Sequence, residues 1–279
     1  AAIGVLYFLA DKEEEAAEAL ERAVELDSDS SGPRLTLAQV YSDMKQSEKA
    51  EAQLEKARGL INTIGDDRKR RSMLAMAWHA QTYMNLSEGN DAEAMESAQE
   101  VIALRSANLH ATCLAYSNMG ILEARKRHYD LAIEYLDQAF EMNPFLYRAG
   151  GALGRLLINR KRYERAEKVL GKVLELTPSA GGSTHYAYGM ALGKLGRREK
   201  ALAQYRRALE DGLAPMDTLM ARWKTIWLSE WGRYTVIGAL LAALLAWLIL
   251  TQPSPEAITL IAIVVVIFTL QRVMKRHLP

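Results

Sequence analysis

The sequence predicts an all-α protein, a right-handed α-solenoid of about six helix pairs followed by a two-helix transmembrane hairpin. Three observations lead to this fold class. Residues 1–214 carry a self-similar pattern with a period near 34 residues. Residues 239–268 are almost free of charge and are interrupted once, at TQPSPE. Charge is also unevenly divided, because residues 1–145 hold 15 Lys+Arg and 25 Asp+Glu, whereas residues 146–279 hold 20 and 9. Such asymmetry favours an acidic partner or a membrane surface.

The period is clearest in two neighbouring copies, GILEARKRHYDLAIEYLDQAFEMNP and GRLLINRKRYERAEKVLGKVLELTP, which begin at Gly120 and Gly154. The equivalent pairs are Gly120/Gly154, Tyr129/Tyr163, Ala132/Ala166, Leu136/Leu170, Ala139/Val173 and Pro144/Pro178. Looser copies start at Gly4, Ala38 and Gly189, and a sixth fits between Met73 and Leu104 with a two-residue insertion near 87–90. A fixed period of this length indicates a repeat architecture.

Each copy contains two runs with apolar residues at helical spacing, separated by a short polar turn such as 125–128 or 160–162. One helix pair cannot bury its apolar face alone, so neighbouring pairs must stack into a continuous superhelix. The spacing therefore predicts a solenoid over residues 1–214.

These positions resemble the tetratricopeptide repeat family, whose consensus has a small residue at position 8, Tyr at 11, Ala at 20, an apolar residue at 24 and Pro at 32. Tyr7 and Tyr41 match position 11, and position 20 is matched by Ala16, Ala50, Ala132, Ala166 and Ala201. The resemblance covers roughly residues 1–212. The first copy begins at position 5, so we expect the natural protein to extend further upstream.

The resemblance implies a concave groove, lined by the first helix of each pair, that binds an extended peptide or a helix. The positions expected to line it are Gln81, Asn85, Asn118, Arg125, Arg155, Asn159, Tyr186 and Lys194. Asparagine can bond a peptide backbone both ways, and arginine can hold a carboxylate. The groove becomes basic toward residue 214, so we expect an acidic segment or a C-terminal carboxylate as ligand. The alternative is that Arg155 and Lys194 are simply solvated.

Residues 215–233 predict a further helix with Trp223, Trp227 and Trp231 at four-residue spacing. One interpretation is a capping helix that covers the last repeat. The other is an interfacial belt, in which indole rings lie at the level of lipid headgroups.

Residues 234–279 predict the transmembrane hairpin with a basic tail. No formal charge lies among the 22 residues between Arg233 and Glu256, or among the 15 between Glu256 and Arg272, and a spanning helix needs about 20 apolar residues. Pro253 and Pro255 forbid one continuous helix. The alternative is a buried hairpin within a soluble protein.

The cations that flank the hairpin place the repeats and the C-terminus on the cytoplasmic side, or on the equivalent side of an organelle such as the stroma. The residues expected at the membrane interface are Trp223, Trp227, Trp231, Arg233, Tyr234, Arg272, Lys275 and Arg276.

The sequence offers no catalytic constellation, so we expect no enzyme, no cofactor and no metal. The single Cys113 has no partner thiol, and the five histidines lack metal-ligand spacing. The basic turns such as KRHYD and INRKRYERAEK predict a solvated edge or convex surface, with contact to anionic lipids as the alternative. Aromatic residues occupy core positions of the repeat, so we expect no nucleic acid.

We therefore expect a membrane-anchored protein–protein interaction scaffold or assembly factor. Its partners would be a protein, membrane lipids and other subunits of a membrane complex. The alternative is an integral accessory subunit of a secretion, polysaccharide-export or photosynthetic or respiratory complex, whose hairpin packs on partner helices.

Overall fold

The structure is a computed structural model that describes residues 1–10, 12–104, 107–229, 243 and 247. These residues form thirteen helices and no strand. The helices are α1 (Ala2–Leu9), α2 (Glu13–Leu26), α3 (Ser31–Asp43), α4 (Ser47–Asn62), α5 (Asp67–Glu88), α6 (Asp91–Ala103), α7 (Leu109–Arg125), α8 (Tyr129–Met142), α9 (Tyr147–Asn159), α10 (Tyr163–Leu176), α11 (Gly182–Lys194), α12 (Arg198–Glu210) and α13 (Pro215–Leu228).

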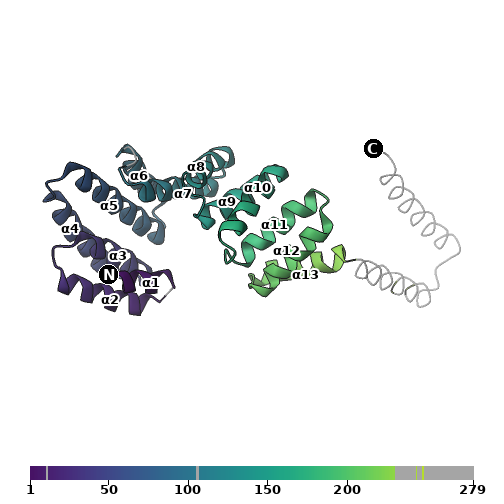
Figure 1. Ribbon diagram of the computed structural model, residues 1–279, viewed down its shortest axis with the longest axis horizontal. Helices are drawn as coiled ribbons and strands as arrows, with labels where there is room; N and C mark the ends of the chain where they lie inside the picture. Colours follow the sequence, from purple (N-terminus) through teal and green to yellow (C-terminus); the bar gives the residue numbers. More distant parts are fainter. Residues whose placement is uncertain (11, 105–106, 230–242, 244–246, 248–279) are drawn as a thin grey trace. The chain divides into compact units, whose positions relative to one another are not determined.

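The first twelve helices form six consecutive pairs, and the two helices of each pair pack against one another (Figure 1). Second helices contact the first helix of the next pair, as α8 contacts α9 and α10 contacts α11. First helices also touch across pairs, as α9 does with α11. The predicted solenoid of helix pairs is confirmed. The copy between Met73 and Leu104 is third along the chain and has irregular spacing. Its first helix, α5, is accordingly longer than the other first helices.

Close approach of the two helices in a pair explains the glycine and leucine that recur at 34 residues. A Cβ built on Gly154 would lie 2.4 Å from Cγ of Leu170, and one on Gly120 would lie 2.6 Å from Cγ of Leu136. Real Cβ atoms do not approach so closely, so the leucine of the second helix occupies the space that a larger residue on the first helix would need.

A left-handed residue occupies the same turn in five of the pairs, just after the first helix. Glycine supplies it at Gly89 (φ 82°) and Gly196 (φ 76°), whereas Lys45, Arg127 and Lys161 adopt φ values of 59°, 64° and 59°. This conformation ends a helix by turning the chain back toward the next one, and glycine adopts it most readily.

The apolar core of the solenoid is divided into three clusters. The first runs from α2 to α5 around Leu20, Leu37 and Leu54. A smaller one joins α5, α6 and α7 around Val101. The third runs from α8 to α11 around Leu153. Each cluster is shared by successive pairs, as stacking requires.

By its contacts the chain forms two compact units, Ala1–Ala221 and Arg222–Pro279. The predicted hairpin, residues 234–279, lies almost entirely outside the described residues. Within the part of the chain that is described, no helix is both long and apolar enough to cross a membrane.

Candidate functional site

The predicted groove residues lie on four first helices. Gln81 and Asn85 belong to α5, Asn118 and Arg125 to α7, Arg155 and Asn159 to α9, and Tyr186 and Lys194 to α11. Their surroundings differ between the two ends of the solenoid, and this difference locates the candidate site.

Both amides of α5 are engaged within the protein. Arg58 donates to Oε1 of Gln81 over 3.2 Å, and Gln81 donates to Oδ1 of Asn85 over 3.2 Å. Asn85 is buried and donates in turn to the hydroxyl of Ser97 on α6 over 3.4 Å. The structure thus gives Asn85 a role in packing α5 against α6, since its amide points into the pair rather than into an open groove.

Arg125 is also engaged, because its guanidinium lies 2.6 Å from Oδ1 of Asp91, at the start of α6 in the preceding pair. Asn118, about two turns further back on α7, is partly exposed. Among the expected groove residues of the first four pairs, therefore, Asn118 alone has no side-chain hydrogen bond within the described residues.

At the C-terminal end of the groove Arg155 is exposed, and its guanidinium makes no hydrogen bond or ion pair within the described residues. Protein atoms around the guanidinium lower the pKa of Arg155, and the charge of Asp217 on α13 opposes that shift. Arginine stays charged in either case. Asp217 is not among the predicted groove residues, because it lies beyond the recognised repeats.

Tyr186 lies on α11, which contacts α9. Its ring packs against that of Tyr205 at a centroid distance of 5.6 Å. Burial raises the pKa of Tyr186, and Asp217 raises it further, so the phenol keeps its proton at neutral pH. Lys194 and Asn159, at the ends of α11 and α9, are exposed. The two helices thus present two cations, an amide and a phenol.

Gly151, a buried residue of α9, leaves a small space beside Arg155. A Cβ on Gly151 would lie 3.7 Å from a terminal nitrogen of Arg155 and 3.5 Å from the hydroxyl of Thr184. These are ordinary contact distances, so the missing side chain leaves room for about one methyl group next to the guanidinium.

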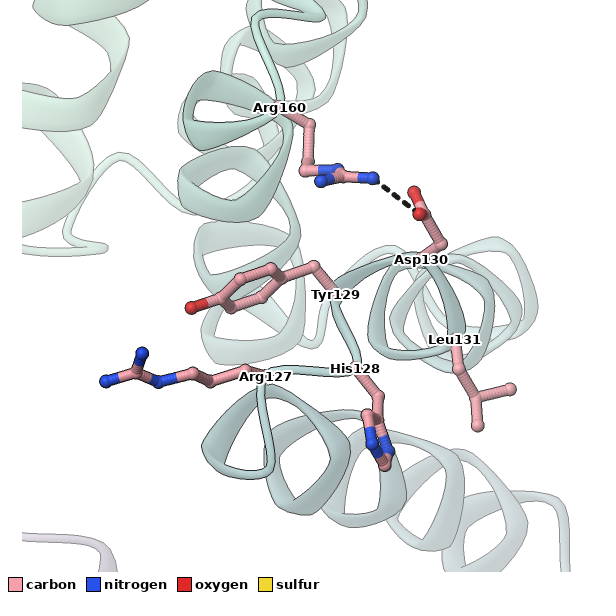
Figure 2. A pocket seen from close by; sticks show the side chains of 6 residues that line it. All are labelled: Arg127, His128, Tyr129, Asp130, Leu131 and Arg160. Carbon is pink, nitrogen blue, oxygen red and sulfur yellow. Dashed lines mark hydrogen bonds and ion pairs between the residues drawn. The ribbon is translucent and has the colours of Figure 1, made fainter.

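The basic turns are connected by ion pairs that join one helix pair to the next. Figure 2 shows a small hollow at the turn before α8, where Arg160, the residue after α9, reaches Asp130 over 2.5 Å while Arg127 points away from that pair. Arg162 also reaches Asp130, over 3.4 Å, and Arg197 pairs with Glu167. The predicted solvated edge thus contains cations that link neighbouring repeats.

α13 leaves its apolar side chains exposed. Ala221 is its one buried residue, whereas Met216, Leu219 and Trp223 are 69%, 62% and 51% exposed. The capping and the interfacial-belt interpretations of this helix both stay predictions. The other expected interface residues, Trp231, Arg233, Tyr234, Arg272, Lys275 and Arg276, lie outside the described residues.

Stacked helix pairs with a small residue facing a leucine define a class of helical-repeat α-solenoid. One sequence model of the tetratricopeptide repeat matches residues 7–62 and 124–192. A second model of the same repeat matches residues 182–210. Together they cover slightly more than half of the chain. The chain therefore belongs to the tetratricopeptide repeat family.

Solved structures share this fold at low identity. PilF from Pseudomonas aeruginosa is 14% identical with a TM-score of 0.61, over 80% of this chain and 95% of PilF. A chain of the APC/C hetero-tetramer Cut9–Hcn1 is 16% identical with a TM-score of 0.62, and the match covers 80% of this chain and 42% of that chain. PilW, a type IV pilus biogenesis factor, is 17% identical with a TM-score of 0.52, and the match covers 74% of this chain and 89% of PilW. Among curated proteins, none matches the chain.

Proposed function

We propose that this protein is a membrane-anchored interaction scaffold or assembly factor. The groove at α9 and α11 binds an acidic segment or a C-terminal carboxylate of a partner protein and holds it at the cytoplasmic face of a membrane, or at the equivalent face in an organelle. The role is binding rather than catalysis. PilF and PilW, a pilus biogenesis factor by its description, share the fold and are compatible with an assembly role.

The observation that carries the groove assignment is Arg155. A guanidinium offers five donors in a fixed fork. The side chain of Arg155 is exposed, neighbouring protein lowers its pKa, and none of its donors has a protein acceptor within the described residues. A ligand carboxylate would give it a charge-assisted, bidentate partner, which is among the stronger polar contacts available to a protein.

Neighbouring groups add to this chemistry. Lys194 extends the positive charge along α11, and Asn159 can bond a peptide backbone both ways. Tyr186 offers a ring edge and a protonated hydroxyl. A peptide that lies across α9 and α11 therefore meets donors for its acidic groups and for its main chain.

Membrane anchoring rests on the sequence of residues 234–279. The uncharged run after Arg233 is long enough to span a bilayer, and the basic residues on both sides favour a cytoplasmic location of both ends. The test is flotation of membranes after alkaline carbonate extraction. We expect the full chain to float, and a chain shortened before Tyr234 to be released. Release of the full chain would contradict anchoring.

The groove is tested with the full chain in detergent and a fluorescent peptide of alternating Glu and Gly, beside its Gln and Gly counterpart. We expect the acidic peptide to bind, and Arg155→Ala to weaken that binding about tenfold or more. Arg206→Ala, which removes an exposed cation from the second helix α12, is the matched control and should leave the affinity unchanged. Equal effects of the two variants would show that general charge, not the groove, attracts the peptide.

One sequence feature supports the accessory-subunit alternative. Small residues gather in the first predicted membrane segment, at Gly238, Ala239, Ala242, Ala243 and Ala246, and small residues allow close packing of helices in a membrane. Replacing the hairpin with an unrelated one separates the two roles. A scaffold keeps its function after this exchange, whereas an accessory subunit loses it.

A further inference from the structure

Helix α13 has one apolar face, and that face is exposed to solvent. At about 100° per residue, six apolar side chains fall within an arc of roughly 120°. They are Met216, Leu219, Met220, Trp223, Ile226 and Trp227. Five of them are among the large apolar side chains that the protein leaves exposed. The rings of Trp223 and Trp227 stack within this face, with centroids 6.2 Å apart and planes 18° apart.

The opposite face of α13 cannot supply a hydrophobic interface. It contains the buried Ala221 together with Thr218 and Thr225. The Thr218 hydroxyl donates to the carbonyl oxygen of Ala214 over 3.1 Å, and the Thr225 hydroxyl donates to that of Arg222 over 2.7 Å. Asp217 lies between this face and the apolar arc, about 60° beyond Met220, and its charge acts on the pKa values of Arg155 and Tyr186. The one acidic group of the helix thus lies near enough to the groove residues to act on their pKa values, and it lies outside the apolar arc.

Two cations border the apolar face. Arg222 precedes it and Lys224 follows it around the helix, each about 40° beyond the nearest apolar residue. Both are exposed, and neither forms an ion pair among the described residues. A long basic side chain beside an apolar arc can extend to a headgroup phosphate while its methylenes cover apolar surface.

This arrangement fits a lipid surface better than a protein partner or a second copy. Cations on both sides of an apolar arc match a plane of phosphates, whereas a protein groove offers acidic groups at only a few points. The sequence after α13 points the same way, since no formal charge follows Arg233 until Glu256. Indole rings also favour the boundary between headgroups and acyl chains.

We infer that α13 lies flat in the interface of an anionic membrane, with its apolar face among the acyl chains and with Arg222 and Lys224 at the headgroups. The inference deepens the proposed membrane attachment, and names anionic lipid as the partner of a specific helix.

The test places an environment-sensitive NBD dye on α13 of the full chain in vesicles. Cys113 is buried, so Leu219→Cys supplies the accessible thiol. Thr218→Cys, on the opposite face, and Lys200→Cys, exposed on α12, are the matched controls. The vesicles contain either phosphatidylcholine alone or phosphatidylcholine with phosphatidylserine, each with brominated acyl chains as quencher. Carbonate-resistant flotation is measured on the same samples.

We expect blue-shifted, quenched emission at residue 219 in the anionic vesicles and little change at either control. Arg222→Glu combined with Lys224→Glu should reduce the quenching at 219 to the control level. Flotation with an unquenched dye at 219 would overturn the inference and leave the anchor standing. Quenching at 219 without carbonate-resistant flotation would support the helix and overturn the integral anchor. Quenching that is equal at 219 and 218, or crosslinking of residue 219 to a second copy, would refute the flat orientation.

Discussion

His79 should make the solenoid sensitive to mild acid. This residue lies on α5 with 8% of its surface exposed, and its Nδ1 atom is buried without a hydrogen-bond partner. Burial, together with the nearby charge of His110, lowers the pKa of His79 from 6.5 to about 4. The unfolded chain binds a proton near pH 6.5, whereas the folded chain resists it until about pH 4. Stability from this residue is therefore complete above pH 6.5 and is lost as the pH falls toward 4.

The size of the effect follows from the two pKa values. A difference of about 2.5 units corresponds to roughly 3 kcal/mol once the pH is below both values. At pH 5 the loss should be about 2 kcal/mol, because the folded state is still mostly unprotonated there. That is a large share of the stability of an ordinary domain.

The assay is urea unfolding of the full chain in detergent, followed by circular dichroism at pH 7.5 and pH 5.0. The informative variant is His79→Leu, because Leu37 and Leu153 occupy the corresponding position in two other repeats. We expect this variant to lose about 2 kcal/mol less than the wild type on acidification. His110→Gln is the control, and should keep most of the pH dependence, since burial is the main cause of the shift. Equal losses in the wild type and His79→Leu would refute the argument.

Three further outcomes are expected in the same unfolding assay. Gly154→Ala should cost about 1–3 kcal/mol, because its methyl group would overlap the facing leucine, whereas Gly59→Ala, in open space within α4, should stabilise by about 0.5–1 kcal/mol; equal effects would contradict the close approach. Gly196→Ala should cost about 1 kcal/mol through its positive φ alone, and an unchanged urea midpoint would argue against the left-handed turn. The Arg197–Glu167 pair, measured by a double-mutant cycle, should contribute at most about 1 kcal/mol and should weaken in 1 M salt; a larger, salt-independent coupling would indicate a buried pair.

The repeat architecture could be predicted from the sequence because its signals are local. A glycine on the first helix and a leucine on the second must recur together, since one fills the space that the other leaves, as Gly154 and Leu170 do. That pairing depends on the helix pair alone. It is therefore visible in any copy without knowledge of its neighbours.

The groove was predictable only in part, because the surroundings of a side chain depend on neighbouring helices. Gln81 and Asn85 occupy groove positions by alignment, yet α5 continues to Glu88 and these amides bond to Arg58 and Ser97. Asp217 could not be recognised, because it follows the last repeat. The link between Arg125 and Asp91 could have been found, since the two residues are 34 positions apart, and opposite charges at one-repeat spacing are a detectable signal.

The division of the core into three clusters decides how ligand binding can be observed. A ligand at α9 and α11 would touch only the cluster that runs from α8 to α11. In a repeat protein each segment is stabilised by its immediate neighbours, so the added stability fades along the chain. A reporter on α3 or α4, in the cluster that begins at α2, would register almost nothing. Trp78, on α5, is similarly distant in the sequence, so a melting curve read from its fluorescence would miss the event, whereas hydrogen exchange at α9 and α11 amides would record it.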